Sequence, residues 1–401
     1  MMRIFCLAAS LALSVGLWAQ KFEGLALTPP MGWNSWNTFQ TNINEALVKE
    51  TADKLVSSGM RDAGYVYLVL DDAWMAKERD ENGNLVPDPK KFPGGMKKLV
   101  DYVHSKGLKF GLYNCAGTQT CAGYPGTRGY EYQDARFYAG LGIDYLKFDW
   151  CNTEGINAKE AYTTMSKALK TAKRPIVFSL CEWGTNKPWE WAAPVGHLWR
   201  TTGDIYGCFD CIKNYGNWNA WGVMQIIDMQ KDIRQYAGPG HWNDPDMMEV
   251  GNGLNVNESR AHFSMWAMLA APLIAGNDIR KMSKETEAIL TNKDVIAVNQ
   301  DVLGIEGFKY AMKDSVEIWF KPLKGNDWAV CFLNRSHTPQ SFQFEWMNET
   351  INDTLSKRTL DAKGTAYTIR DLWTKKDLGN TKKPLKGIIP SHDVVMVRLT
   401  K

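Results

Sequence analysis

The stretch YLKFDWCN, residues 145–152, begins as an apolar strand and ends in a carboxylate, a tryptophan and a cysteine. Because side chains alternate between the two faces of a strand, Lys147 and Asp149 share one face with Tyr145. A buried lysine–aspartate pair is costly unless the two charges meet each other or a ligand. This strand therefore predicts either a structural ion pair or a binding site at its carboxyl end.

Segments of the same kind recur along the chain, each a short apolar run that ends in acids or aromatics. Strands that alternate with helix-like segments in this way are typical of the α/β class and predict a (β/α)8 TIM barrel. A doubly wound open sheet is the main alternative, but it would need a G-x-G-x-x-G loop after a strand, which this sequence does not have. The runs are 27–36, 65–74, 108–117, 143–152, 174–184, 198–204, 239–248 and 269–278.

The polar ends of these runs predict where the site lies. In a (β/α)8 barrel the active site is built at the carboxyl ends of the strands. In the sixth run, Arg200 and Asp204 also share a face by strand alternation. We expect these side chains to converge at one mouth: Trp36, Asp71, Asp72, Tyr113, Asp149, Glu182, Arg200, Asp204 and Asp246.

Between the first runs lie segments with helical spacing, over residues 44–64, 93–107 and 157–172. After about residue 305 the pattern changes to a period of two, and residues 316–336 predict a β-hairpin. The sequence thus predicts a barrel over residues 20–305 and a small antiparallel β-sandwich domain over residues 306–401.

Residues 1–19 have the pattern of a secretory signal peptide, so we expect an exported protein, periplasmic or extracellular. Seven cysteines follow this segment, so at least one is unpaired in a monomer. Cys208 and Cys211 form a C-x-x-C, for which a loop disulfide is favoured over a zinc or redox site. A formal net charge of +3 on 401 residues gives no reason to expect a nucleic acid or a membrane as partner.

The residue types at the mouth indicate a sugar ligand. Only six histidines occur, and none forms H-x-H or H-E-x-x-H, so the sequence predicts neither a metal nor another cofactor. Carboxylates accept hydrogen bonds from hydroxyl groups, and several of the 17 tryptophans fall at strand ends where they can stack on a sugar ring.

Glycoside hydrolysis needs two carboxyl groups with opposite tasks. Asp149 lies beside Lys147, a cation that would keep it ionised as the nucleophile or base. Asp204 follows Thr-Thr-Gly at another strand end and is our candidate for the proton donor. Glu182 and Asp246 remain alternatives from the chemistry alone.

The motifs PPMGWNSWNTF, LDDAW, YLKFDWCN, LCEWG, WRTTGDI and GPGHWNDPDMMEVGN resemble those of family 27 of the glycoside hydrolases, the α-galactosidases. The resemblance runs in order from about residue 25 to residue 305. It implies a retaining mechanism with Asp149 as nucleophile and Asp204 as acid/base, and a disulfide between Cys121 and Cys151. The sugar-binding positions that it implies are Trp36, Asp71, Asp72, Tyr113, Lys147, Cys181, Glu182, Trp183, Arg200 and Asp246.

Trp183 is bulky and lies near the expected position of the sugar 2-hydroxyl, which favours a galactoside over an N-acetylgalactosaminide. The alternatives are a β-L-arabinopyranosidase or α-N-acetylgalactosaminidase on the same scaffold, a galactose-binding protein without activity, and a metal-dependent barrel hydrolase. Two departures from the family pattern stand out. Ala73 replaces a cysteine that many members carry, and the C-x-x-C after Asp204 leaves the leaving-group preference open.

Overall fold

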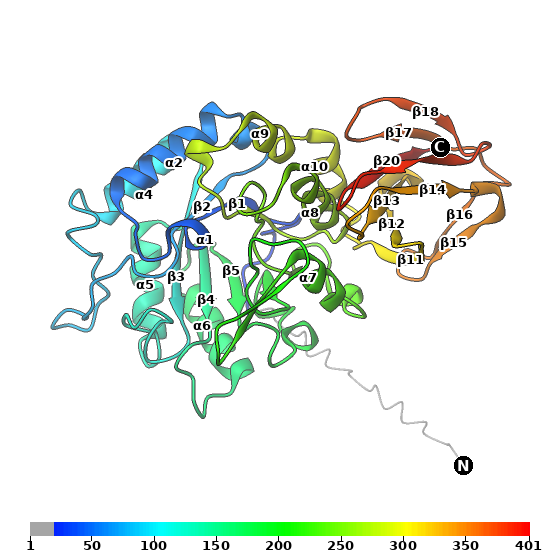
Figure 1. Cartoon of the computed structure of the whole chain (residues 1–401). Coiled ribbons are helices and arrows are strands. Elements are labelled where there is room, and N and C mark those ends of the chain that lie inside the picture. The colour runs from blue at the N-terminus through cyan, green and yellow to red at the C-terminus, as the bar shows by residue number, and fades with distance from the viewer. Residues whose placement is uncertain (1–19) are drawn as a thin grey trace, which may run out of the picture.

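The computed structural model describes residues 20–401, so the predicted signal peptide lies outside the described residues. The chain forms two parts that lie side by side, a strand-and-helix barrel and a C-terminal domain of strands (Figure 1). Among the described residues, no helix is long and apolar enough to cross a membrane.

The first part is the predicted barrel. Its strands are parallel in the order β10-β1-β2-β3-β4-β5-β6-β9. A bridge from Met248 to Ala275 closes the ring, with the Met248 amide donating to Ile274 O at 2.7 Å. Each of the predicted runs contains one of these strands: β1 (Met31–Asn34), β2 (Tyr67–Val69), β3 (Lys109–Cys115), β4 (Tyr145–Asp149), β5 (Val177–Cys181), β6 (Leu198–Arg200), β9 (Trp242–Asp244) and β10 (Leu273–Ala275).

Helices occupy most connections between these strands. The helical segment predicted over 44–64 divides into two helices, because Gly59 adopts a left-handed φ of 78° between them. The described connection from β5 to β6 holds only the 3-10 helix η1 (Pro188–Glu190). The α-helices are α1 (Trp36–Phe39), α2 (Glu45–Ser57), α3 (Met60–Ala63), α4 (Met96–Ser105), α5 (Glu131–Leu141), α6 (Ala158–Thr171), α7 (Val223–Met229), α8 (Val256–Met268), α9 (Lys284–Leu290) and α10 (Lys293–Asn299), with further 3-10 turns η2 (Arg234–Tyr236) and η3 (Ile279–Lys281).

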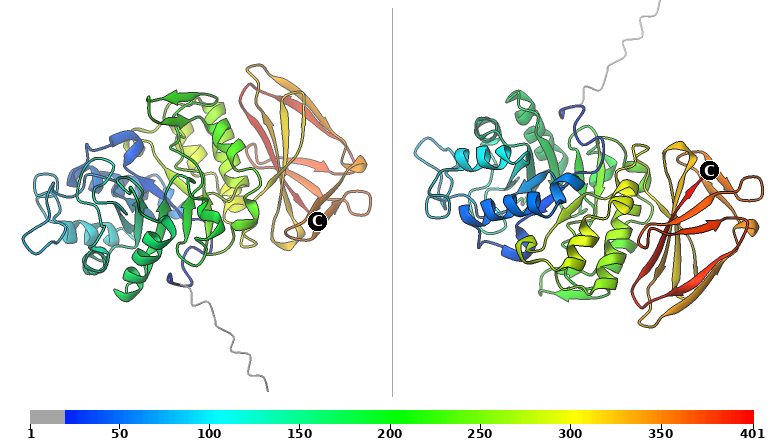
Figure 2. Two further views of the ribbon diagram at one scale, coloured as in Figure 1. Left: turned by 90° about the horizontal axis from the view of Figure 1, so that it is seen from below. Right: turned by 90° about the horizontal axis from the view of Figure 1, so that it is seen from above.

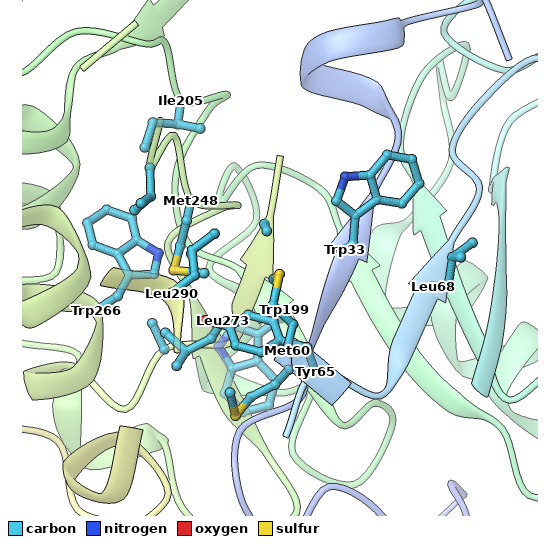
Figure 3. Close-up of a cluster of buried hydrophobic side chains, with 14 of the residues drawn as sticks. Trp33, Met60, Tyr65, Leu68, Trp199, Ile205, Met248, Trp266, Leu273 and Leu290 are labelled. Atoms are coloured by element: carbon cyan, nitrogen blue, oxygen red, sulfur yellow. The ribbon is translucent and has the colours of Figure 1, made fainter. Parts of the chain in front are cut away.

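The alternation predicted for β4 is confirmed. Leu146 and Phe148 pack in the core between the strands and the helices. Tyr145 lies inside the barrel, in a cluster with Tyr67 and Trp242. Lys147 and Asp149 occupy the next two inward positions toward the carboxyl end. Figure 3 shows part of the larger core, where Trp33, Leu68 and Trp266 are fully buried.

The second part is antiparallel, as predicted. One sheet has the order β11-β12-β13-β20-β17-β18, and two strand pairs, β14-β19 and β15-β16, accompany it. Its core contains Phe320, Trp328 and Phe332. The strands are β11 (Phe308–Lys313), β12 (Val316–Pro322), β13 (Trp328–Asn334), β14 (Gln340–Phe344), β15 (Thr350–Asp353), β16 (Arg358–Asp361), β17 (Thr368–Asp371), β18 (Asp377–Asn380), β19 (Leu385–Ile389) and β20 (Val394–Thr400), with η4 (Lys324–Asn326) and η5 (Trp346–Asn348) between them.

The two parts lie side by side, as the two views of Figure 2 show from opposite sides, and the contact between them is apolar. Trp319, Cys331 and Met396 belong to the same core cluster as the barrel helices. The ammonium of Lys321 is buried there and donates to Ala267 O of α8 at 2.8 Å. The C-terminal domain therefore covers an apolar side of the barrel around α8.

Two disulfides form among the described residues. Cys208–Cys211 confirms the predicted loop disulfide, and Cys121–Cys151 joins the loops that follow β3 and β4. In residues 20–401 the remaining cysteines, Cys115, Cys181 and Cys331, are buried thiols.

Candidate active site

A cleft opens at the carboxyl ends of the barrel strands. A concave site with converging polar groups is the usual form of a small-ligand site. The side chains that line it are Trp36, Asn37, Asp71, Asp72, Tyr113, Cys121, Lys147, Asp149, Trp183, Arg200, Asp204, Asp246 and Met247.

The floor of the cleft holds a buried ion pair. Lys147 Nζ lies 2.8 Å from Asp71 Oδ2, and that oxygen also accepts from Asn34 Nδ2 at 2.8 Å. Burial alone would lower the pKa of Lys147, but the neighbouring carboxylates, Asp71 first among them, hold it well above its ordinary value. Lys147 is therefore a fixed cation at the bottom of the cleft.

Asp72 is held on the neighbouring side by the loop after β3. Its Oδ2 accepts from the Ala122 amide at 2.9 Å, and burial raises its pKa. The adjacent Cys121 accepts a hydrogen bond from the Tyr113 hydroxyl at 3.2 Å and is tied to Cys151 at the end of β4. The disulfide thus fixes the loop that holds Asp72.

Asp149 is buried deep in the cleft, with 6% of the residue exposed. Its Oδ1 accepts from the Trp150 amide at 2.9 Å. Burial raises the pKa of Asp149 to about 7; Lys147 opposes this rise and Asp204 adds to it. Lys147 thus favours the ionised form of Asp149, but its ammonium pairs with Asp71 and burial has the larger effect on the Asp149 pKa.

Asp204 lies at the mouth of the same cleft, with its side chain 40% exposed. Arg200 orients it, donating through Nη2 to Asp204 Oδ1 at 3.1 Å. The same Nη2 lies 2.7 Å from Asp246 Oδ2, which also accepts from the Ile205 amide at 2.8 Å. Burial raises the pKa of Asp246 to about 6 despite the charge of Arg200. Of the two predicted catalytic carboxyl groups, Asp149 is thus buried beside the Trp150 amide, and Asp204 is exposed and held by Arg200.

Two predicted residues do not line the cleft. Glu182 is fully buried, and its Oε2 accepts from the backbone and side-chain nitrogens of Asn186 at 2.6 and 2.7 Å. Burial raises the pKa of Glu182 to about 7, and within residues 20–401 its Oε1 has no hydrogen-bond donor. Cys181 lies one layer deeper, with Sγ 3.6 Å from Arg200 Nη1. The chain turns sharply after Cys181, where Trp183 adopts a φ of 59° and enters the cleft in their place.

Asn37 and Met247 line the cleft but were missed by the reasoning from sequence. Asn37 Nδ2 donates to Glu249, a buried carboxyl group whose pKa burial raises to about 7. Both residues directly follow or neighbour a predicted strand end, so the rule that singled out Trp36 and Asp246 could have found them. The contact of Asn37 with Glu249 spans 212 positions of sequence, so only the fold brings these two residues together.

Among the described residues, one group of three possible metal ligands lies close together, namely Cys121, Asp149 and Cys151. The two cysteines are joined in a disulfide and so offer no thiolate to an ion. The arrangement fits acid–base chemistry on a polyhydroxyl ligand better than it fits a metal centre.

Comparison with known proteins agrees with this arrangement. The family model described as alpha galactosidase A matches residues 28–301, and that of the alpha galactosidase C-terminal beta sandwich domain matches residues 313–399. The chain is 54% identical to alpha-galactosidase A of Cellvibrio japonicus over 98% of this chain and 97% of that protein.

Solved structures give the same result. Alpha-galactosidase I of Mortierella vinacea is 37% identical, with a TM-score of 0.87 over 94% of this chain and 98% of that one. The alpha-galactosidase of Saccharomyces cerevisiae with raffinose is 31% identical, with a TM-score of 0.86 over 95% and 99%.

Proposed function

The chain belongs to the α-galactosidase family of glycoside hydrolases and hydrolyses terminal α-D-galactosyl residues, and from this premise we propose that Asp149 is its nucleophile and Asp204 its acid/base. The observation that carries the proposal is the pair of unlike carboxyl groups in one cleft. Asp149 is 6% exposed at the bottom, whereas the Asp204 side chain is 40% exposed at the mouth.

In the first step the ionised Asp149 carboxylate attacks the anomeric carbon of galactose. The bond to the glycosidic oxygen breaks, and Asp204 gives its proton to that oxygen, so the leaving group departs as a neutral alcohol. The position of Asp204 supports this role, because the leaving group must exit through the mouth. The position of Asp149 supports the other, because a buried carboxylate is shielded from water while the covalent bond forms.

In the second step a water molecule attacks the same carbon. Asp204, now a carboxylate, takes the proton of that water, and Asp149 leaves as a carboxylate. Two inversions return the original configuration, so the first product is α-D-galactose. Arg200, which contacts both Asp204 and Asp246, holds the acid/base in place through both steps.

The remaining cleft residues bind and orient the sugar in this proposal. The Asp71–Lys147 pair and Asp72 present acceptors and a cation for ring hydroxyl groups, and Trp36 offers an apolar face. The other binding positions are Tyr113, Trp183, Arg200 and Asp246. Glu182 and Cys181 do not line the cleft, so in this proposal they act only indirectly, by packing against the residues that do.

Trp183 supports a preference for galactosides. Its indole enters the cleft from the loop after β5 and takes up room that a 2-acetamido group would need. This agrees with the curated relatives, and the alternatives of an α-N-acetylgalactosaminidase or a β-L-arabinopyranosidase are not favoured. The substrates are galactose-containing oligosaccharides or glycans.

Export from the cytoplasm is also part of the proposal. Disulfides persist in oxidising compartments, and the described chain holds two of them beside the active site. Together with the signal-peptide pattern of residues 1–19, they support a periplasmic or extracellular enzyme.

The test is hydrolysis of p-nitrophenyl α-D-galactopyranoside by the mature protein. Asp149→Asn should lose several orders of magnitude in kcat, and Asp204→Asn about 10²- to 10⁴-fold, the usual contribution of a general acid–base group. Asp144→Asn is the matched control, because Asp144 precedes the same strand at its opposite end, paired with Arg174. Two results would contradict the mechanism. One is an Asp149→Asn variant as active as the wild type, and the other is β-D-galactose as the first anomer seen by NMR.

A further inference from the structure

A hairpin of exposed aromatic residues begins immediately after Asp204. Its strands are β7 (Ile212–Asn214) and β8 (Asn219–Trp221), and the Cys208–Cys211 disulfide closes the loop that leads into it. Tyr206, Tyr215 and Trp218 are 38%, 46% and 46% exposed. Large aromatic side chains gathered on a small exposed hairpin mark an interaction surface.

The hairpin is joined to the acid/base by backbone hydrogen bonds. The Trp221 amide donates to Asp204 O at 2.9 Å, and the Tyr206 amide donates to Trp221 O at 2.8 Å. These two hydrogen bonds form a parallel bridge between Ile205 and Trp221. The bridge lies along one edge of β8, and β7 pairs with the other edge. The segment that carries Asp204 thus lies along the edge of the two-stranded β7–β8 sheet and joins it through this single bridge.

Strand alternation assigns the faces of this sheet. Ile205, Trp221 and Ile212 are in register, so their side chains share one face. Ile205 is buried, and the Trp221 indole lies against Gly203, where an added Cβ would be 2.9 Å from Nε1. At Ile205 and Trp221 this face is therefore turned toward the protein, whereas Ile212 at its outer edge is 55% exposed.

Asp204, Tyr206 and Lys213 fall on the opposite face. Lys213 Nζ lies 6.0 Å from the ring centre of Tyr206 and 5.9 Å from that of Tyr215, so both rings lie near this ammonium group. Tyr215 stacks on Trp218 with ring centres 4.4 Å apart and an angle of 15° between the planes. We call Tyr206, Lys213, Tyr215 and Trp218 the aromatic face.

We propose that the aromatic face is the subsite for the sugar residues of the leaving group. The inference rests on the proposed function, because Asp204 protonates the glycosidic oxygen and the sugars attached to that oxygen must extend from Asp204 toward the solvent. The aromatic face continues from Asp204 on the same side of the same small sheet. Its rings can stack on the apolar faces of neutral sugars, and Lys213 can donate to their hydroxyl groups.

The proposal predicts discrimination by leaving-group length. We compare α-D-galactosyl fluoride, whose leaving group is one atom, with raffinose and with a galactosyl oligosaccharide that has a longer leaving group. The variants are Tyr215→Ala, Trp218→Ala and the double variant. Activity on the fluoride should stay within about twofold, and kcat/KM on the longest substrate should fall roughly tenfold, mostly through KM, as expected when stacking contacts are lost.

Ile212→Ala is the matched control, because Ile212 is 55% exposed on the same hairpin but on the other face. It should leave all substrates unchanged, and Trp218→Phe should restore most of the lost affinity. An equal loss on all substrates, the same selective loss in Ile212→Ala, or no change on any substrate would overturn the inference. So would a concentration-dependent dimer that only the aromatic variants abolish, since a second copy would then occupy the face.

A wild-type enzyme inert on α-D-galactosyl fluoride would instead disprove the proposed function. Calorimetry with the galactose-free leaving-group oligosaccharide tests the subsite without catalysis. Binding to wild type that weakens about tenfold in the double variant supports the subsite, and equal binding by both proteins overturns it.

Discussion

The two carboxyl groups proposed as catalytic, those of Asp149 and Asp204, have the same chemistry and different surroundings. Asp149 is buried, so its ionised form is disfavoured, and its pKa is raised to about 7. Asp204 is half in solvent and held by the Arg200 guanidinium. This contrast at the level of single residues supports the two proposed roles, and it predicts how the activity of the enzyme responds to pH.

The first step requires Asp149 to be ionised, so kcat/KM should fall as the pH drops below about 7. The charge of Asp204 adds to the rise in the pKa of Asp149, so the position of this limb of the pH profile depends on Asp204. Removing that charge in Asp204→Asn should move the limb to lower pH. The measurement is kcat/KM against pH with α-D-galactosyl fluoride, whose leaving group needs no proton. A limb near pH 4 in wild type, or one that moves upward in the variant, would contradict this account.

Replacing Lys147 should change the stability of the fold. Lys147→Met leaves Asp71 buried without its cation, so the free energy of unfolding should fall by about 3 kcal/mol or more. Lys187→Met is the control, because Lys187 is 65% exposed and its contact with Glu190 is a loose surface pair that contributes little. Denaturant unfolding measures both, and equal effects would show that the Asp71 pair is not a buried ion pair of this kind.

At the level of elements, the disulfides differ in what they constrain. Cys121–Cys151 closes a loop with a sequence separation of 30, whereas Cys208–Cys211 has a separation of 3. Loop-closure entropy predicts that Cys121→Ser/Cys151→Ser lowers the free energy of unfolding by about 3–4 kcal/mol, and Cys208→Ser/Cys211→Ser by clearly less. The first variant should also lose activity, since its loop carries the amide that binds Asp72. Thermal unfolding measures the stability of both variants, and assays of galactoside hydrolysis measure their activity. A larger loss of stability in Cys208→Ser/Cys211→Ser than in Cys121→Ser/Cys151→Ser would disprove the argument.

The elements also show where reasoning from sequence succeeds. Each predicted run contains one barrel strand, because short apolar segments with polar ends are a local signal. The connections were less predictable. The segment over 44–64 divides at Gly59, and no α-helix fills the described chain between β5 and β6. The β7–β8 hairpin was not predicted at all, since its strands are short and mostly exposed.

At the level of the whole molecule, charged pairs hold the C-terminal domain against the barrel. Arg260 of α8 binds Asp393, with Nε 2.7 Å from Oδ1, and the Asp393 side chain is 2% exposed. Arg370 of β17 binds Asp294 of α10 across the same contact, but it is 51% exposed. The first pair is buried on its acidic side and the second is on the surface.

Arg260→Ala should therefore lower the free energy of unfolding by about 3 kcal/mol, because Asp393 is left buried and unpaired. The double variant Arg260→Ala/Asp393→Ala should cost less than the sum of the two single changes. Arg370→Ala, as the control, should cost at most about 1 kcal/mol. A double-mutant cycle from denaturant unfolding gives the coupling, and strictly additive effects would show that the pair does not hold the two parts together.

The sequence by itself determined the order of the barrel strands, the end of the barrel at which the acids gather, and the faces of β4. These follow from apolar periodicity and strand alternation, which are properties of neighbouring residues. Only the tertiary structure decided which charged side chains pair with each other and which are buried. Lys147 pairs with Asp71 across 76 positions, and burial raises the pKa of Asp149 more than the Lys147 charge lowers it. Burial and charge pairing depend on what the fold brings within a few ångströms, and a local pattern carries no information about those distances.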